Sequence, residues 1–149
     1  MVNHSGKPVG VEVSIDGINM FAFSKIPSYQ RSGKIFLASP ETRIEGWHVA
    51  DGPGGSKAFL ITEFPQSAQA LIGTKDSSRL GTINVLFRST WKEGEEPPPQ
   101  PVGVKGEPGT GLGQPKNNTF KPTRGFFGAI RASVSIRYTK PAPKPPGLP

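Results

Sequence analysis

The chain has no cysteine among its 149 residues, which excludes disulfide bonds and metal sites built from thiolates. It also has only two histidines, His4 and His48. A protein metal site usually needs three or four converging ligands, and no His/Asp cluster in the sequence has that spacing. We therefore expect no metal ion and no other cofactor.

Long apolar runs are missing as well. No run approaches the ~18 residues that a membrane-spanning helix requires. Residues 1–8 lack the apolar middle of a signal peptide. The sequence therefore predicts neither a membrane span nor a signal peptide. It leaves the localisation open, with a virion or a cell surface among the places that fit.

Glycine and proline are abundant, whereas apolar residues are scarce. Hydrophobic residues make up 34% of the chain, against ~45–50% in typical globular proteins, a figure that also counts glycine. The 19 glycines and 17 prolines together give 36 of 149 residues, about twice the usual ~12%. The length fits one domain. We expect a modest core and much irregular chain.

Alternation of apolar and polar residues predicts short strands. Residues 9–15 alternate valine and isoleucine with smaller or polar residues, and Asp16-Gly17 follows, a dipeptide typical of tight hairpin turns. The clearest alternation covers 128–138. Further strands are expected at 18–23, 34–38, 43–49, 57–64 and 81–88, with a strand or a single helical turn at 68–72. About seven or eight strands predict an all-β fold, an antiparallel β-sandwich resembling a jelly roll.

Two segments lack the alternating pattern that predicts strands. The organisation we expect is an N-terminal arm (1–8), the first part of the sandwich (9–92), a Gly/Pro-rich insertion loop (93–125), the last core strand (126–139) and an extended Pro/Lys-rich tail (140–149). A long loop inside a compact domain is typical of a functional segment or one that a partner orders. We therefore expect contacts with partner proteins through Pro97, Pro98, Pro99, Leu112, Phe120, Lys140, Lys144 and Leu148.

The positive charge is concentrated at the C-terminal end. The net charge is +7; residues 1–107 hold eleven basic and eleven acidic residues, and the remaining 42 hold seven basic residues and no acid. Such asymmetry favours nucleic acid or an acidic protein surface as a partner, or else a solvated tail that aids solubility. The candidate contacts with phosphate or with an acidic surface are Lys116, Lys121, Arg124, Arg131, Arg137 and Lys140.

Catalytic residues are hard to assemble from this sequence. A Ser-His-Asp arrangement would have to use His48 as its base, and no G-x-S-x-G elbow is present. We interpret His48 as an ordinary surface histidine. Paired carboxylates among Glu41, Glu45 and Asp51 lie near turns, where acids are common. We therefore expect that the chain is not an enzyme.

Several short motifs resemble those of a group of uncharacterised β-sandwich proteins of bacterial and phage type. That group shares a V-S-[IV]-D-G-x-N opening, a central G-[WF] and a late G-x-I-x-V-x-F strand. The matching stretches are 13–19 (VSIDGIN), 44–47 (IEGW), 58–60 (AFL), 81–87 (GTINVLF) and the glycine-rich 109–113. The resemblance covers about residues 11–138. It implies a sandwich fold and carries neither an activity nor site residues.

The leading hypothesis is a non-enzymatic structural or interaction module that docks into a larger assembly, or self-assembles, through its extended arms. A capsid-decorating or virion structural protein would fit, as would a subunit of a surface fibre. One alternative is a nucleic-acid-associated protein that uses the basic C-terminal third. Another is a carbohydrate-binding sandwich with Trp47, Trp91 or Tyr29 as a sugar platform.

Overall fold

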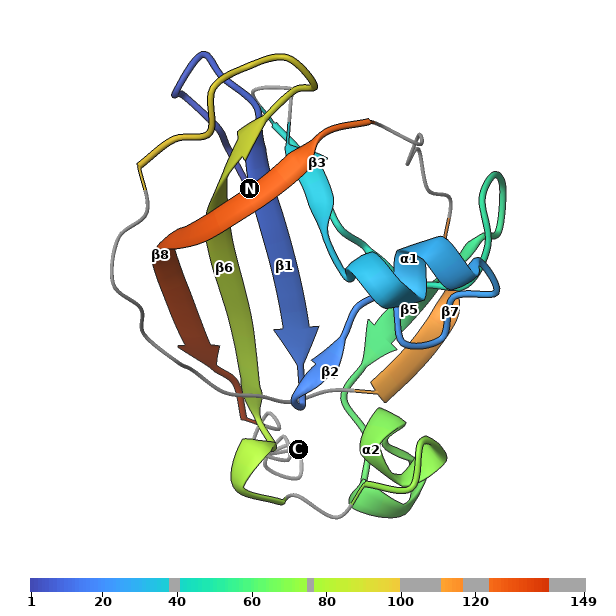
Figure 1. The fold of residues 1–149 in the computed structure, drawn as a ribbon. Coiled ribbons are helices and arrows are strands. Elements are labelled where there is room, and N and C mark those ends of the chain that lie inside the picture. Colours follow the sequence, from blue (N-terminus) through green and yellow to red (C-terminus); the bar gives the residue numbers. More distant parts are fainter. Residues whose placement is uncertain (38–40, 75–76, 100–110, 117–123, 140–149) are drawn as a thin grey trace, which may run out of the picture.

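The computed structural model describes residues 1–37, 41–74, 77–99, 111–116 and 124–139. Within them the fold is mostly β, with antiparallel strands in two sheets and only two short α-helices (Figure 1). The predicted all-β class is therefore confirmed at this level.

The larger sheet has five strands, four of them in the order β2-β1-β6-β8, and β3 pairs with the first half of β1. The strands are β1 (Val9–Ile15), β2 (Ile18–Asn19), β3 (Ile35–Leu37), β6 (Thr82–Trp91) and β8 (Phe126–Arg137). The register places Val13 beside Val85, and Val85 beside Val134. Because directly opposed residues share a face of the sheet, such rows form one apolar face that runs from β1 to β8.

The smaller sheet has the order β4-β5-β7. Its strands are β4 (Gly46–His48), β5 (Ser56–Leu60) and β7 (Gly111–Lys116). Strand β7 lies inside the segment 93–125, where the sequence predicts a loop. Its residues G-L-G-Q-P-K show no clear alternation, and Pro115 cannot donate to a ladder. An edge position tolerates such a proline, and among the described residues β7 pairs only with β5.

Three predicted strands are clearly shorter than expected, of which the one expected at 43–49 spans only Gly46–His48. The strand expected at 18–23 ends at Asn19, because the Asn19 side chain accepts the Phe21 N–H and donates to the Gly33 carbonyl, which turns the chain. The strand expected at 57–64 ends at Leu60. The remaining elements are α1 (Pro27–Ser32), α2 (Ala68–Leu71) and the 3₁₀ turns η1 (Phe64–Gln66) and η2 (Ser77–Arg79). Of the two alternatives for 68–72, the helical turn is correct, and the Ser67 hydroxyl caps it by accepting the Ala70 N–H.

The hydrophobic core gathers around β1. Trp47 of β4 is fully buried and meets Phe23 and Phe59 edge to face, with ring centroids 5.4 and 5.3 Å apart. It belongs to the same buried cluster as the β1 residues Val11, Val13 and Ile15. The second sheet thus contributes its largest side chain to the core at β1.

Candidate functional site

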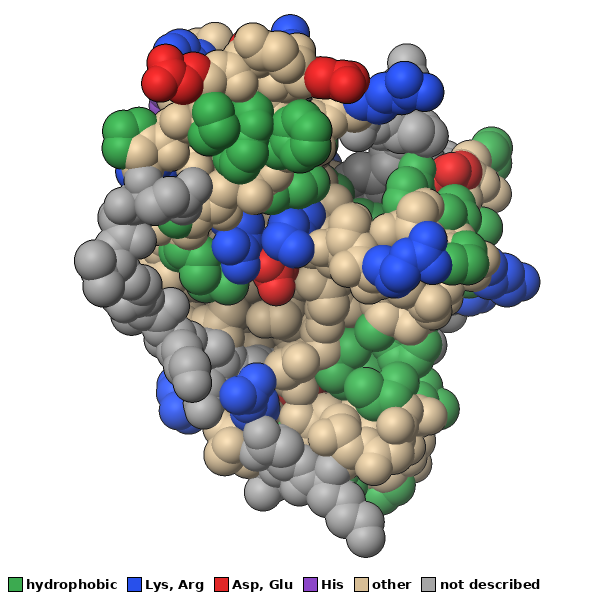
Figure 2. Space-filling model, in the orientation of Figure 1, with side chains coloured by type: hydrophobic (Ala, Val, Ile, Leu, Met, Phe, Trp, Pro, Cys, Tyr) green, Lys and Arg blue, Asp and Glu red, His purple; other side chains and the backbone are tan. Residues whose placement is uncertain are grey.

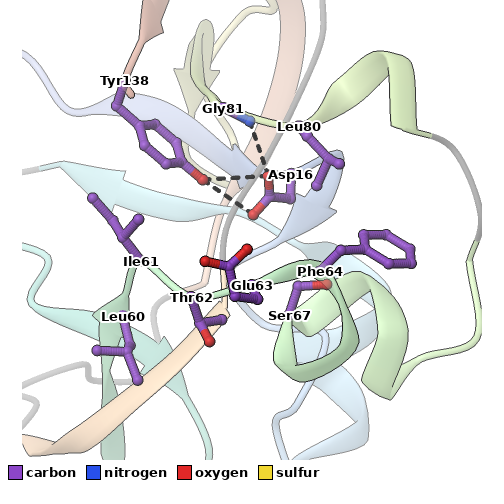
Figure 3. Close-up of a pocket in the computed structure, with 10 residues that line it drawn as sticks. All are labelled: Asp16, Leu60, Ile61, Thr62, Glu63, Phe64, Ser67, Leu80, Gly81 and Tyr138. Atoms are coloured by element: carbon purple, nitrogen blue, oxygen red, sulfur yellow. Dashed lines mark hydrogen bonds between the residues drawn. The ribbon is translucent and has the colours of Figure 1, made fainter. Parts of the chain in front are cut away.

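A cleft of about 230 Å³ opens where β1 turns into β2 (Figure 3). One wall is the segment from the end of β5 into η1, with the exposed apolar side chains of Leu60, Ile61 and Phe64. The other wall includes Asp16 and Tyr138, which approach each other from the first hairpin and from the end of β8.

The turn at Asp16-Gly17 builds this end of the cleft. Asp16 has φ 57° and Gly17 has φ 73°, so both central residues occupy the left-handed region. The predicted hairpin is therefore confirmed, with β1 and β2 paired antiparallel on either side of the turn. Glycine and short polar residues such as aspartate adopt this conformation most readily.

The Asp16 side chain joins three segments that are far apart in the sequence. Its carboxylate accepts the Gly81 N–H at 3.1 Å and the Tyr138 hydroxyl, whose oxygen lies 3.1 Å from Oδ2. Its backbone carbonyl accepts the Gln69 side-chain amide at 2.6 Å. Burial raises the pKa of Asp16 to about 6, and the hydrogen bond from Gly81 opposes that rise.

The chemistry available to Asp16 is limited by these same bonds. A general acid or base must reach the proton that it transfers, whereas Asp16 is buried and its carboxylate already binds Gly81 and Tyr138. Glu63 lines the same cleft, with its carboxylate directed toward the Asp16–Tyr138 pair (Figure 3). The arrangement fits a structural junction beside an apolar cleft better than it fits a reaction centre.

A second polar cluster links Ser24, His48 and Asp51. The His48 Nδ1 lies 3.0 Å from the Ser24 hydroxyl, and Nε2 lies 3.3 Å from Asp51 Oδ1. His48 is fully buried, so its interpretation as a surface histidine is wrong. The Phe21 and Tyr29 rings pack against the imidazole, with centroids 5.2 and 5.1 Å away, and exclude solvent from it.

These are the three residue types of a hydrolase triad, but the serine is not presented to a substrate. Ser24 is buried, and its hydroxyl accepts the Ile26 N–H at 3.1 Å. Burial lowers the pKa of His48, and Asp51 opposes that shift. Burial, followed by the nearby Asp51 carboxylate, raises the pKa of Tyr29. The cluster thus connects β4 with two loops. Sequence reasoning missed it because no motif joins residues 24 and 48.

The three aromatic residues proposed as a sugar platform are separated. Trp47 is buried in the core and cannot stack on a sugar, which corrects that prediction. Tyr29 packs between Phe21 and His48. Trp91 is partly exposed at the end of β6 and stacks on Phe126, with centroids 5.6 Å apart.

The predicted contact residues fall into three groups. Arg124, Arg131 and Arg137 are exposed on or just before β8, and Arg131 donates to the carbonyl of Pro99, the last of the exposed or partly exposed prolines Pro97–Pro99. Leu112 and Lys116 belong to β7 and pair with Phe59 and Ser56 of β5. The others lie outside the described residues: Phe120, Lys121, Lys140, Lys144 and Leu148.

Within the described ranges, no three His, Asp or Glu side chains gather as metal ligands would. No helix in the part of the chain that the structure describes has the length and apolarity to cross a membrane.

Comparison with protein-family models, curated proteins and solved structures finds no match to this chain. The resemblance to uncharacterised β-sandwich proteins therefore stays a prediction.

Proposed function

We propose that the chain is a non-enzymatic, sandwich-like interaction module that docks into a larger protein assembly through β8. A capsid-decorating protein or a subunit of a surface fibre is the kind of assembly component that we have in mind. The docking surface, which we call the open flank, comprises the outer edge of β8 and the apolar residues Val134 and Ile136.

The observation that carries the proposal is a loss of burial along one row of the sheet. Val13 is 5% exposed, its neighbour Val85 is 8% exposed, and the next residue in the row, Val134, is 45% exposed. In the adjacent row, Ile15 is buried whereas Ile136 is 51% exposed. An apolar face that is left uncovered on a soluble protein is typical of an interaction site.

The open flank continues into the cleft. Strand alternation puts Tyr138 on the same face as Val134 and Ile136, and Tyr138 lines the cleft. The opposite wall offers the exposed Leu60, Ile61 and Phe64. A partner segment lying along β8 would therefore have apolar surface from the strand to the cleft.

The backbone edge and the charge of β8 indicate what kind of partner segment would bind there. β6 pairs with one side of β8, and no strand within the described residues pairs with the other, which makes this edge the candidate for strand addition. The polar residues of β8 are Arg131, Ser133, Ser135 and Arg137, with no acid among them, and Arg131 lies at a bulge in the pairing with β6. Two copies of β8 would bring only positive charge toward each other, which is destabilising. We infer an extended partner segment with apolar residues on one face and acidic residues on the other.

The test uses a synthetic peptide that alternates valine with glutamate, and a control peptide that alternates valine with lysine. We expect the glutamate peptide alone to slow amide hydrogen exchange in β8. The double variant Val134→Lys/Ile136→Lys should lose this protection, whereas Val2→Lys, another exposed apolar position, should keep it.

Three results would contradict the proposal. They are no protection by the glutamate peptide, equal protection by both peptides, and undiminished protection in the double variant. Protection of the same amides by a single-stranded oligonucleotide at ~50 mM salt, without protection by the peptide, would favour the nucleic-acid hypothesis instead.

A further inference from the structure

A stacked aromatic pair lies at the far end of the large sheet from the cleft. Trp91 ends β6 and Phe126 begins β8; the two residues pair in the ladder, with ring planes 22° apart, and Phe126 is 49% exposed. Figure 2 shows hydrophobic side chains gathered at this end of the molecule, with acidic side chains close by. We call Trp91, Phe126, Glu93 and Glu96 the aromatic–acidic patch.

A second aromatic layer neighbours these rings. Phe127 packs on Phe36 with centroids 4.3 Å apart. A Cβ added at Gly10 would lie 2.5 Å from the Phe127 ring, and one at Gly125 would lie 2.8 Å from the Phe36 ring. The glycines let these rings approach the backbone closely. The backbone next to Phe126 is therefore held in place by tight packing. A binding surface that is already ordered loses less entropy when a partner binds.

The acidic residues are held near the rings by a turn. Directly after Trp91, the Glu95 N–H donates to the Lys92 carbonyl at 3.1 Å, and the Lys92 N–H donates to the Glu95 carboxylate at 2.8 Å. Glu93 and Glu96 are exposed and form no ion pair within the described residues. In a chain with a net charge of +7, this turn is a local concentration of negative charge beside aromatic surface.

We propose that the aromatic–acidic patch binds the proline- and lysine-rich tail, residues 140–149, of a second copy of this chain. The tail K-P-A-P-K-P-P-G-L-P contains five prolines and two lysines. Proline-rich segments favour the polyproline II conformation and dock on aromatic surfaces at low entropic cost. Lys140 and Lys144 then lie opposite Glu93 and Glu96, which gives the contact its charge complementarity.

The length of the tail favours a second copy over the tail of the same molecule. β8 has twelve residues, so its length along the strand is about 37 Å at ~3.4 Å per residue, and it bends where its pairing with β6 is irregular (Figure 1). The ten-residue tail starts beyond the end remote from Phe126 and spans about 31 Å as polyproline II. Its lysines occur in its first half, so only a short segment would be available to reach back along β8 to the acidic residues of its own chain, which favours the tail of a second copy. Because tail and patch are different surfaces, the contact joins copies head to tail.

This inference rests on the proposed docking role but concerns a different surface. It is tested separately by reversing the charges of the patch in one variant and those of the tail in another. The acid variant is Glu93→Lys/Glu96→Lys, and the tail variant is Lys140→Glu/Lys144→Glu. Sedimentation velocity of the full chain at ~50 mM salt should show self-association that each double variant weakens by about tenfold or more. An equal mixture of the two variants should restore association between unlike chains.

The control is Glu45→Lys, which reverses one exposed acid outside the patch and should leave association unchanged. Circular dichroism verifies that each variant is folded. Unfolded variants could not associate with each other. Restored association in the mixture therefore shows that each variant had lost a specific contact and had kept its fold. If neither double variant weakens association, or the mixture fails to restore it, the proposal is wrong. The β8 exchange result is independent of both outcomes.

A second readout uses Trp91 itself. A peptide of residues 139–149 should change the fluorescence of Trp91 in the full chain, whereas Trp47, buried in the core, reports little. A peptide with its prolines replaced by alanine should bind about tenfold or more weakly. A fluorescence change with a β-linked glucose oligomer, and none with the tail peptide, would overturn the proposal in favour of a sugar platform.

Discussion

The two flanks of the large sheet are equally apolar in sequence but differ in what covers them. At β1, Val13 and Ile15 belong to the buried cluster that also contains Trp47 of the second sheet. At β8, the residues of the same rows, Val134 and Ile136, are about half exposed. Alternation thus specifies which face of a strand is apolar. Whether that face is buried depends on which other side chains pack against it.

The largest loss of stability should come from truncating Ile15, the buried residue in the row that ends at the exposed Ile136. Ile15→Ala removes buried methyl groups and leaves a cavity, so we expect a loss of about 2–5 kcal/mol in the free energy of unfolding. Urea denaturation with a fixed m-value measures it. A loss below about 1 kcal/mol would mean that the β1 flank is not the centre of the core.

The covering of the β1 flank should depend on Gly46. A Cβ at this position would lie only 2.1 Å from the Lys57 carbonyl oxygen in the neighbouring strand. Gly46→Ala must therefore push β4, and with it Trp47, away from β5, at a cost of about 1–3 kcal/mol.

The buried Trp47 reports this movement directly, through a red shift of its emission in the Trp91→Phe background. Gly52→Ala serves as the control, because Gly52 has a positive φ but nothing within 4 Å of its added Cβ. Gly46 has no positive φ, so a loss of stability in Gly46→Ala no larger than that in Gly52→Ala would mean that the close approach of β4 and β5 costs no more than backbone strain at an open glycine.

Asp16 connects the two flanks, because it follows β1 and binds Tyr138 just beyond β8. Its pKa is raised to about 6 from 3.8, so its contribution to stability is greatest below pH 3.8 and is lost as the pH rises through 6. Asp16→Asn stays neutral and keeps an acceptor for Gly81. The variant should gain about 1–3 kcal/mol relative to the native chain between pH 4 and pH 7.

The pH dependence of stability due to His48 has the opposite sign to that due to Asp16. The free energies of unfolding of the native chain and of Asp16→Asn must therefore be subtracted at each pH. The pKa of His48 is lowered, and the fold therefore loses stability as the pH falls below the ordinary value of 6.5. This contribution is common to the native chain and to Asp16→Asn, and cancels in the difference. A flat difference between pH 4 and pH 7 would show that Asp16 is not buried as described.

The sequence predicted the strands with regular alternation but not those that tertiary contacts impose. Strands β1, β6 and β8 alternate clearly, and Asp16-Gly17 has a backbone requirement that few residues meet, so these elements were predictable. By contrast, β7 contains Pro115 and becomes a strand only through its pairing with β5. Local patterns do not reveal such long-range pairing.

The candidate sites follow the same rule. The Asp16–Tyr138 contact joins residues 122 positions apart, and the buried Ser24–His48 contact joins residues 24 positions apart. Their residue types are ordinary at surfaces, so only the fold shows that they meet. The exposed arginines of β8 were predictable because charged residues favour solvent.

The smallest effect on stability should come from the open flank. Ile136 is 51% exposed, so Ile136→Ala removes few packed atoms, and we expect a loss below about 1 kcal/mol. The same variant should weaken binding of the valine–glutamate peptide, because the residue is available to a partner. Urea denaturation and hydrogen exchange on one sample measure both effects. A loss as large as that of Ile15→Ala would mean that Ile136 is packed within the free molecule, and the contrast between the two flanks would disappear.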